Sequence, residues 1–312
     1  MSTTPTVIKA KQRPGDRAFS GSAVFAGSMI LVTLAAVALF LIIQSIPALV
    51  ASHEDASILD TNFWEYVGPL VFGTVWAAAL ALLFAVPISI GIALFISHYA
   101  PRRLASVLGY IVDLLAAVPS VVFGLWGIGV LAPAVQPIYS WMVDNLGWFP
   151  LFAGPVSGTG RTILTAGLVL AVMVLPIMTA ICREVFLQTP VLHEEAALAL
   201  GATRWEMIRT AVLPFGRSGI ISASVLGLGR ALGETMAVAM VLSATGVVTF
   251  QLLTSVNPTT IAANIALSFP EAYGMNVNVL IATGLILFIV TFIVNAIARW
   301  IVSRRKEFSG AN

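Results

Sequence analysis

The sequence predicts an all-α integral membrane protein with six transmembrane helices. Of its 312 residues, 59% are hydrophobic and only 10% are charged, whereas a soluble domain usually carries about 25% charged residues. The mean hydropathy is +0.98. Two further observations support this fold class, namely a series of long apolar runs and an uneven distribution of lysine and arginine between them.

Each apolar run is long enough to cross a membrane, because the hydrocarbon core is about 30 Å thick and an α-helix rises about 1.5 Å per residue. The first run is too long for the apolar part of a signal peptide, so we interpret it as a retained anchor. The second contains Pro87, which predicts a tilt or kink. The runs lie at 24–46, 68–97, 104–131, 162–182, 218–245 and 277–301.

The basic residues predict the orientation of these helices. With the N-terminus inside, 14 of the 16 lysine and arginine residues fall in cytoplasmic segments, and acidic residues dominate the outer ones. This is the positive-inside pattern, with both termini in the cytoplasm. The two exceptions are Arg161 and Arg230. We predict a cytoplasmic tail at 1–22, a first transmembrane helix with its outer loop at 23–67, a core at 68–302 and a second cytoplasmic tail at 303–312.

Several kinds of site are not expected in this chain. The single cysteine, Cys182, excludes an intramolecular disulfide and a cysteine metal cluster. The lysines stand only near the chain ends, so the sequence has no phosphate-binding loop with its lysine. We therefore expect no metal or cofactor here, and any ATP with its Mg²⁺ to be bound by another polypeptide. Membrane lipid is the expected surrounding, and nucleic acid is not an expected partner. The histidines show no metal-ligand spacing: His53, His98 and His193.

Some polar residues and outer segments leave alternatives open. The aromatic and proline-rich segments 132–161 and 246–276 are typical of interfacial helices or caps, and they can also dock an external partner. Asp113, in the inner half of the third run, is expected to have a packing or backbone hydrogen-bonding role rather than a place on a substrate path. His98 and His193 are expected at the cytoplasmic surface.

The cytoplasmic loop at 189–215 predicts two short helices with a break between them. Gly201 supplies the backbone conformation that ends the first helix. Thr203 caps the second, with Glu206 three residues later completing a capping box, and Pro214 closes it. From the residues alone, an amphipathic interfacial hairpin without a partner is the alternative.

This loop resembles the EAA loop of ABC importer permeases. Ala211 is a small departure, because the family pattern has a branched aliphatic residue there. The resemblance implies that the loop is a coupling helix that seats in a groove of an ATPase subunit. The residues that match the family pattern are Glu195, Ala196, Ala197, Gly201, Leu213 and Pro214.

Three further segments, at 113–127, 157–176 and 227–238, are similar to the permeases of phosphate-specific importers of the PstC kind. The resemblance implies a type I ABC importer permease fold in the cytoplasmic (inner) membrane of a prokaryote. It implies transport of inorganic phosphate by alternating access. The implied partners are a homologous second permease, two ATPase subunits and an extracytoplasmic phosphate-binding protein. The sister permease, of the PstA kind, has related motifs.

Arg230 and Glu234 are the candidate residues of the substrate pathway. They stand within GLGRALGETMAVAMVL, residues 227–242, where charges are expensive and indicate function by default. On one helix they would lie about 40° apart around the axis and about 6 Å apart along it, facing one cavity. Arginine offers planar, paired donors that match phosphate oxygens. Glu234 can hold Arg230 when the site is empty, or accept a hydrogen bond from a protonated phosphate.

Other interpretations remain at this stage. A buried ion pair between Arg230 and Glu234 would lock helix packing without binding substrate. A permease for another oxyanion, such as sulfate or molybdate, would use the same charges. A secondary transporter driven by protons or sodium would also do so, but it would not need an EAA loop. An intramembrane enzyme is the weakest alternative, because no catalytic pattern stands out.

Overall fold

The computed structural model describes residues 14–243 and 245–303, so most of the predicted tails at 1–22 and 303–312 lies outside the described residues. Within these ranges the chain is helical and forms no strand. The helices are α1 (Pro14–Leu49), α2 (Phe63–Leu94), α3 (Arg102–Ala116), α4 (Ser120–Trp126), α5 (Ala132–Leu146), α6 (Ile163–Leu187), α7 (Val191–Ala199), α8 (Arg204–Met207), α9 (Leu213–Leu232), α10 (Met236–Val241), α11 (Ile261–Ser268) and α12 (Met275–Ser303).

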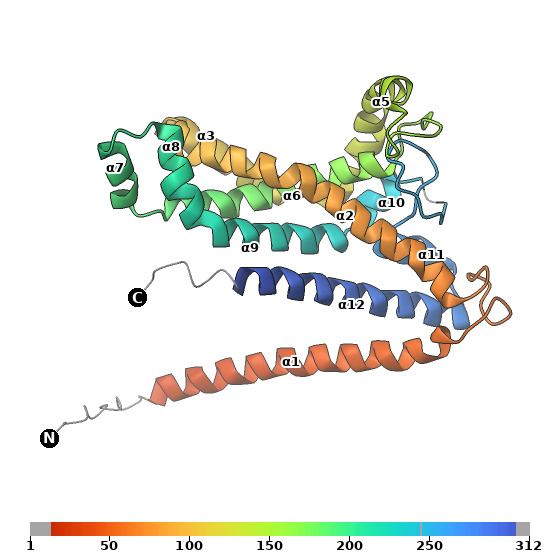
Figure 1. The fold of residues 1–312 in the computed structure, drawn as a ribbon. Coiled ribbons are helices and arrows are strands. Elements are labelled where there is room, and N and C mark those ends of the chain that lie inside the picture. Colours follow the sequence, from red (N-terminus) through yellow and green to blue (C-terminus); the bar gives the residue numbers. More distant parts are fainter. Residues whose placement is uncertain (1–13, 244, 304–312) are drawn as a thin grey trace.

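The long helices run side by side, with α6 at the centre (Figure 1). This helix packs against α2, α3, α9 and α10, and most of its side chains are buried. In contrast, α1 packs mainly on α12 and exposes apolar side chains along its length. We call the end that carries α7 and α8 the inner end, and the opposite end the outer end. α1 begins and α12 ends at the inner end (Figure 1).

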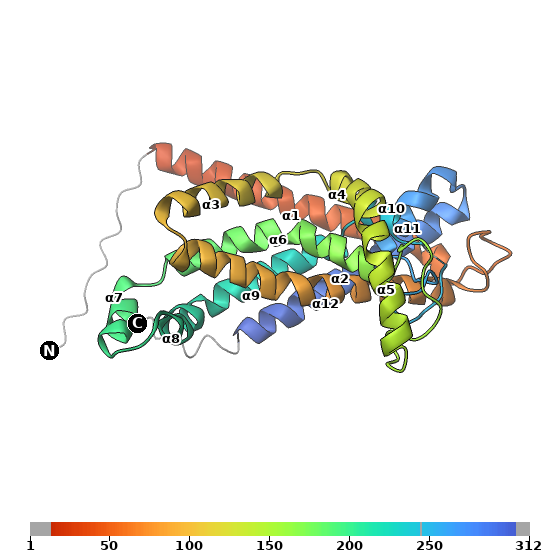
Figure 2. The same cartoon turned by 90° about the horizontal axis from the view of Figure 1, so that it is seen from above.

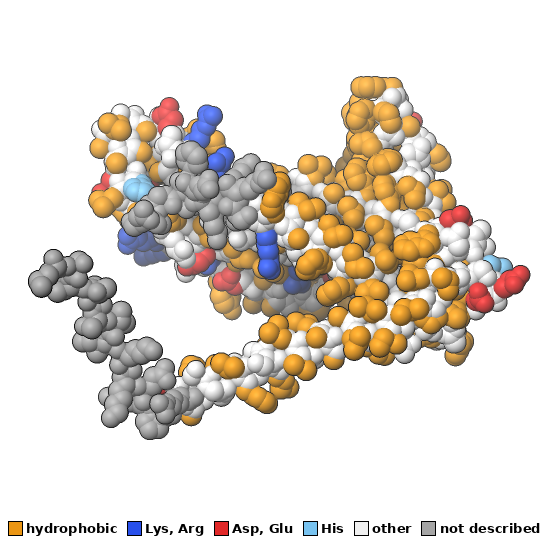
Figure 3. All heavy atoms as spheres, turned by 60° about the horizontal axis from the view of Figure 1, so that its bottom comes forward, with side chains coloured by type: hydrophobic (Ala, Val, Ile, Leu, Met, Phe, Trp, Pro, Cys, Tyr) orange, Lys and Arg blue, Asp and Glu red, His pale blue; other side chains and the backbone are white. Residues whose placement is uncertain are grey.

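Six helical segments are long and apolar enough to span a membrane, as the sequence predicts. In Figure 3 apolar side chains cover the middle of the molecule, and the charged side chains gather toward its two ends. An exposed apolar surface of this kind is stable only in contact with lipid or with other protein. The segments lie at Ala18–Leu49, Phe63–Tyr99, Ser120–Leu146, Ile163–Leu187, Arg204–Leu232 and Met275–Trp300.

The third predicted span is not one straight helix. The run at 104–131 is interrupted after α3, and α4 begins behind Pro119, because a proline donates no backbone hydrogen bond and disfavours helix in the residue before it. Figure 2 shows α5 lying across the direction of the long helices at the outer end. Although α5 falls within the span Ser120–Leu146 by length and hydropathy, its direction is that expected of a helix at a membrane interface.

Three π-helical turns occur in the helices, and each ends two residues before a proline. The turns are Phe95–Tyr99, Gly127–Leu131 and Ile208–Val212. The last hydrogen bond of each joins residues five apart and is donated by Ala100, Ala132 and Leu213, each of which precedes a proline. Because proline cannot donate the next bond, the wider turns at Gly127–Leu131 and Ile208–Val212 accommodate it and the helical path continues. The turn at Phe95–Tyr99 instead ends its helical path, since Ala100 is extended.

The loop at 189–215, called here the inner hairpin, differs from the prediction at its second helix. Pro214 was expected to close that helix, but the helical path runs from Arg204 through the π-turn to Leu232. The expectation was wrong because the π-turn accommodates Pro214, which cannot donate a backbone hydrogen bond, without ending the helix. The second arm of the hairpin is thus continuous with a transmembrane helix.

Candidate substrate pathway and coupling hairpin

Arg230 lies in the last turn of α9, beside the middle of α6. The two helices run antiparallel, because Gly216 of α9 lies against Phe186 near the inner end and Gly227 lies against Met178. At a rise of about 1.5 Å per residue, Arg230 lies roughly 5 Å beyond Gly227 toward the outer end. This places Arg230 level with the centre of the 25-residue helix α6.

The Arg230 side chain is partly exposed, and it forms no hydrogen bond or ion pair with any residue that the structure describes. A charged side chain at this depth is costly when it faces hydrocarbon. Membrane proteins accordingly turn such groups toward a water-filled cavity or toward another protein chain. The guanidinium is therefore available to an anion or to a partner.

Glu234 does not share a helix with Arg230, so the predicted geometry of this pair is wrong. α9 ends at Leu232, where the Gly233 N–H bonds to an earlier carbonyl, and the next helix begins after Glu234. The Glu234 side chain is 8% exposed, and its Oε1 accepts the Ala237 N–H at 3.0 Å. The carboxylate thereby caps α10, a bond that a continuous helix would exclude. No ion pair joins it to Arg230 within the described residues.

The interruption at 233–235, called here the helix break, leads into α10, which packs closely on α4 and α6. Two glycines permit the approach of α4 and the turn that follows it. A Cβ at Gly124 would lie 3.0 Å from the Ala237 Cα, and one at Gly127 would lie 2.8 Å from the Val241 Cγ2. Larger residues would push α10 away.

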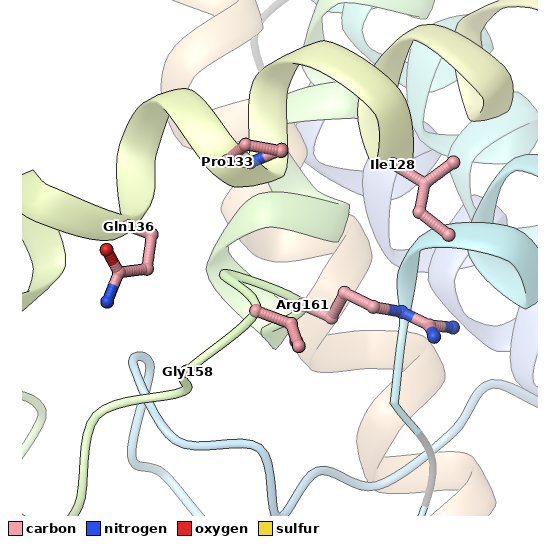
Figure 4. A pocket seen from close by; sticks show the side chains of 6 residues that line it. Ile128, Pro133, Gln136, Gly158 and Arg161 are labelled. Carbon is pink, nitrogen blue, oxygen red and sulfur yellow. The ribbon is translucent and has the colours of Figure 1, made fainter.

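Arg161 holds the far end of α10. Its Nη2 donates to the Met240 carbonyl at 3.1 Å and its Nε to the Val241 carbonyl at 3.4 Å. A cation at a helix C-terminus satisfies carbonyls that lack partners in the helix. In Figure 4 the Arg161 guanidinium points away from Gln136. Both residues line a pocket of about 420 Å³. The pocket is lined by Ile128, Pro133, Gln136, Gly158, Thr159 and Arg161.

Asn257 ties the outer segments together, and sequence reasoning did not identify it. Its side chain is fully buried; Oδ1 accepts the Ile163 N–H at 3.0 Å, and Nδ2 donates to the Thr254 carbonyl at 3.0 Å and the Ser243 carbonyl at 3.4 Å. Its own carbonyl accepts the Thr245 N–H at 2.9 Å. The amide thus joins the start of α6 to the chain that follows α10. From the sequence, the segment 246–276 was expected to be an interfacial or docking segment, and Asn257 had no expected role of its own.

The inner hairpin has the local structure that the sequence predicts at its first turn. Gly201 has a φ of +87° and follows the end of α7. Thr203 and Glu206 form the expected capping box, in which the Thr203 Oγ1 accepts the Glu206 N–H at 3.3 Å and the Glu206 carboxylate accepts the Thr203 N–H at 2.8 Å. These bonds need no residue from elsewhere in the chain.

The residues of the predicted EAA loop divide between two faces. Glu195 and Ala196 are exposed, whereas Ala197 packs against the buried cluster at the inner end, as does Leu213. Pro214 is exposed and lies two residues after the end of the π-turn. α7 therefore has one face on the bundle and one face free. Exposed apolar side chains of the hairpin include Val191, Leu192, Leu200 and Trp205.

Three other predicted positions have different outcomes. Asp113 is exposed on α3 and forms no hydrogen bond with a described residue, so it lacks the expected packing and backbone-bonding role. His193 is exposed on α7, as expected. His98 is not a free surface residue, because its ring contacts the Glu194 carboxylate.

Comparison with known proteins gives a consistent picture. Residues 85–307 match the family described as binding-protein-dependent transport system inner membrane component. The chain is 48% identical over 311 residues to phosphate transport system permease protein PstC 2 of Mycobacterium tuberculosis, covering 95% of each chain. It is 41% identical over 308 residues to the PstC protein of Mesorhizobium japonicum, covering 95% of this chain and 92% of that protein.

Solved structures share the fold at much lower identity. A chain of a bacterial alginate ABC transporter, in complex with a pentasaccharide-bound periplasmic protein, aligns with a TM-score of 0.62 at 17% identity. The alignment covers 92% of this chain and 95% of that one. A second structure of a bacterial ABC transporter, involved in alginate import, aligns with a TM-score of 0.52 at 19% identity over 76% of this chain and 79% of that one. The architecture is that of type I ABC importer permeases.

Proposed function

The chain belongs to the family of binding-protein-dependent transport system inner membrane components and, within it, to the phosphate transport system permease proteins, and on this premise we propose that it conducts inorganic phosphate as the permease subunit of an ATP-driven importer. It is a multi-pass protein of the bacterial inner membrane. The names of its relatives support phosphate as the substrate.

The observation that carries this proposal is Arg230, which lies beside the helix break and has no partner among the described residues. Non-helical backbone at membrane depth is tolerated where it is buried in protein or lines a water-filled cavity. The break at 233–235 lies one turn beyond Arg230, and Gly233 is exposed. A guanidinium with free donors next to such a break can bind a passing oxyanion through paired hydrogen bonds.

Glu234 borders the same pathway and also shapes it. Its Oε1 fixes the start of α10, and no other hydrogen bond to the carboxylate links it to a described residue. The second oxygen can accept a hydrogen bond from a protonated phosphate oxygen. A fully deprotonated oxyanion such as sulfate has no proton to donate, so this acceptor favours phosphate.

The inner hairpin is proposed to couple transport to ATP hydrolysis on another subunit. Its free face, with Glu195, Ala196 and the apolar residues of α7, supports docking into a groove of an ATPase. Gly201 sets the bend, and Ala197, Leu213 and Pro214 join the hairpin to the bundle. The motion then enters α9 directly, because the helical path continues from Arg204 to Leu232.

The complete importer is proposed to contain this chain, a homologous second permease, two ATPase subunits that hold ATP and Mg²⁺, and an extracytoplasmic phosphate-binding protein. ATP binding draws the ATPases together, and the hairpins follow. The helices around Arg230 then change the side of the membrane to which they open.

Uptake of labelled phosphate by the reconstituted complex tests the proposal. Vesicles containing the complex should accumulate phosphate only when ATP and the binding protein are present. Sulfate and molybdate in equal amount should not compete. Uptake without ATP, or uptake that sulfate or molybdate suppresses, would contradict the proposed function. Matched vesicles with an ATPase subunit that binds but does not hydrolyse ATP provide the control.

A further inference from the structure

A nearly buried histidine joins the inner end of α2 to α7. Only 9% of the His98 side chain is exposed, and its Nε2 lies 3.3 Å from Oε1 of Glu194, whose side chain is 22% exposed. His98 stands in the π-turn that ends α2, and Glu194 stands in the first turn of α7. The contact therefore links two elements that are distant in the sequence.

A second hydrogen bond fixes the orientation of the His98 ring. The Ser97 Oγ lies 2.7 Å from Nδ1. When the Ser97 hydroxyl donates to Nδ1, the ring proton stands on Nε2 and points to the carboxylate of Glu194. Both ring nitrogens then have partners, and the bond to Glu194 is strengthened by the negative charge of its acceptor.

Little else attaches α7 to the membrane-spanning helices. No residue of α7 is buried. Among the described residues, the His98–Glu194 contact is the only hydrogen bond between α7 and a transmembrane helix. Ala197 adds an apolar contact with the cluster at the inner end, and it shares a face with Glu194 because the two stand three residues apart.

Besides the short chain 188–190 that joins it to α6 and the apolar contacts at the inner end, the inner hairpin has two connections that bear on the helices around Arg230. One is covalent and helical, since α8 continues through the π-turn into α9 and reaches Arg230. The other is the His98–Glu194 contact, which leads into α2. Because α2 packs on both α6 and α9, its position affects the helices that surround Arg230.

We propose that His98 is a positioning residue that makes α2 follow α7 during the transport cycle. This inference rests on the proposed function, in which the inner hairpin receives the motion of an ATPase. With the contact intact, both α9 and α2 move with the hairpin. Without it, α2 is held to the hairpin only by apolar packing at the inner end and follows it less closely, so that ATP hydrolysis proceeds without the complete rearrangement of the helices.

The ratio of phosphate transported to ATP hydrolysed tests this role in the reconstituted complex. His98→Ala and Glu194→Ala should each lower the ratio about fivefold, as expected for a partly exposed hydrogen bond to a charged group, whereas Glu194→Gln should lower it less because glutamine keeps an acceptor oxygen. The amount of assembled complex and the rate of ATP hydrolysis should change little. The exchange His98→Glu with Glu194→His should restore part of the ratio, because it rebuilds the pair in reverse.

His53→Ala is the control, because His53 is an exposed histidine in the loop between α1 and α2, at the opposite end of the molecule from the inner hairpin. It should leave the ratio unchanged. An unchanged ratio in His98→Ala would overturn the proposal, as would a loss of assembled complex that accounts for the whole loss of uptake. If the wild-type complex moved sulfate rather than phosphate, the proposed substrate would be wrong, but the sulfate-to-ATP ratio would still test His98.

Discussion

The inner hairpin and the helix break both interrupt the bundle, but different interactions hold them. In the hairpin, Gly201 turns the chain and Thr203 bonds to a residue three positions away. At the break, the Glu234 carboxylate also makes a local cap, but Arg161 holds the end of α10 across about eighty residues of chain, and Asn257 reaches Ile163 across 94. The comparison teaches that the hairpin is a locally determined rigid piece, whereas the break exists only within the complete fold.

The largest effect is expected from removing the long-range tie at the outer end. Asn257→Ala should eliminate most of the assembled protein, because it leaves the Ile163 N–H and two carbonyls buried without partners. Each such group costs about 1–3 kcal/mol, against a total stability of about 5–15 kcal/mol. The amount of purified complex and its denaturation midpoint measure the loss.

Asn145→Ala is the control for this variant. Asn145 is exposed and bonds only to the Trp141 carbonyl four residues earlier. It should purify in normal amount. Normal abundance and stability of Asn257→Ala would show that the break does not depend on its long-range ties, and the contrast with the hairpin would disappear.

The next largest effect is expected from substituting Gly201, which should disturb the coupling of transport to ATP hydrolysis without preventing folding. Gly201→Val should still insert but lose most of its phosphate transport per ATP hydrolysed. No atom lies within 4 Å of a Cβ built at this position, so the damage comes from the backbone, whose φ is +87°. A left-handed conformation costs an ordinary residue about 1–2 kcal/mol, and more for a β-branched one. Gly201→Asn should be milder.

Gly246→Val imposes the same strain at the outer end, since Gly246 has a φ of +70° and equally open surroundings. This control should lower the amount of protein at most, without changing the ratio of phosphate to ATP. Equal uncoupling by both variants would mean that backbone strain anywhere disturbs transport. Normal uptake by Gly201→Val would contradict the proposed role of the hairpin in coupling transport to ATP hydrolysis.

The smallest effect is expected from the capping box. Thr203→Ala removes a helix cap worth about 1 kcal/mol, so the opening of this turn should increase about fivefold. Amide hydrogen exchange at 204–207 measures it, and Thr203→Ser should exchange at the normal rate. Complete loss of the complex in Thr203→Ala would contradict the view that the hairpin forms locally and independently.

The same contrast explains how far the sequence could predict the structure. The number of spans, the bend at Gly201 and the capping box follow from hydropathy and short-range bonding, and they are confirmed. The third span is displaced from the predicted 104–131 to Ser120–Leu146. The helix break was missed because GRALGETMAV contains no proline and is apolar enough to continue a helix. It forms because the carboxylate of Glu234 caps the start of α10, Arg161 bonds to its end, and Asn257 fixes the chain that follows it.

The roles of single residues were also only partly predictable. Arg230 was expected to matter because a charge at membrane depth is costly, and its lack of a described partner is in keeping with that expectation. His98 was expected to be an ordinary surface residue, because the sequence does not indicate a contact with Glu194, which lies 96 positions away. The domain boundaries remain predictions, and so does the assignment of the coupling residues.

The central claim is that Arg230 binds the substrate, while Glu234 also holds the break. Arg230→Lys keeps the charge but loses the planar fork, so it should assemble normally and transport poorly. Glu234→Gln keeps the shape of the side chain and an acceptor oxygen for the Ala237 N–H. It should therefore retain assembly better than Glu234→Leu.

The most direct measurement is phosphate uptake, normalised to complex abundance, by Arg230→Lys and by the double variant Arg230→Met with Glu234→Leu. We expect Arg230→Lys to assemble in normal amount with uptake reduced at least about tenfold, since paired hydrogen bonds to phosphate contribute more than a single point charge. The double variant should not transport at any level of assembly. Normal uptake by the double apolar variant would contradict this account, because the two charges would then serve packing alone.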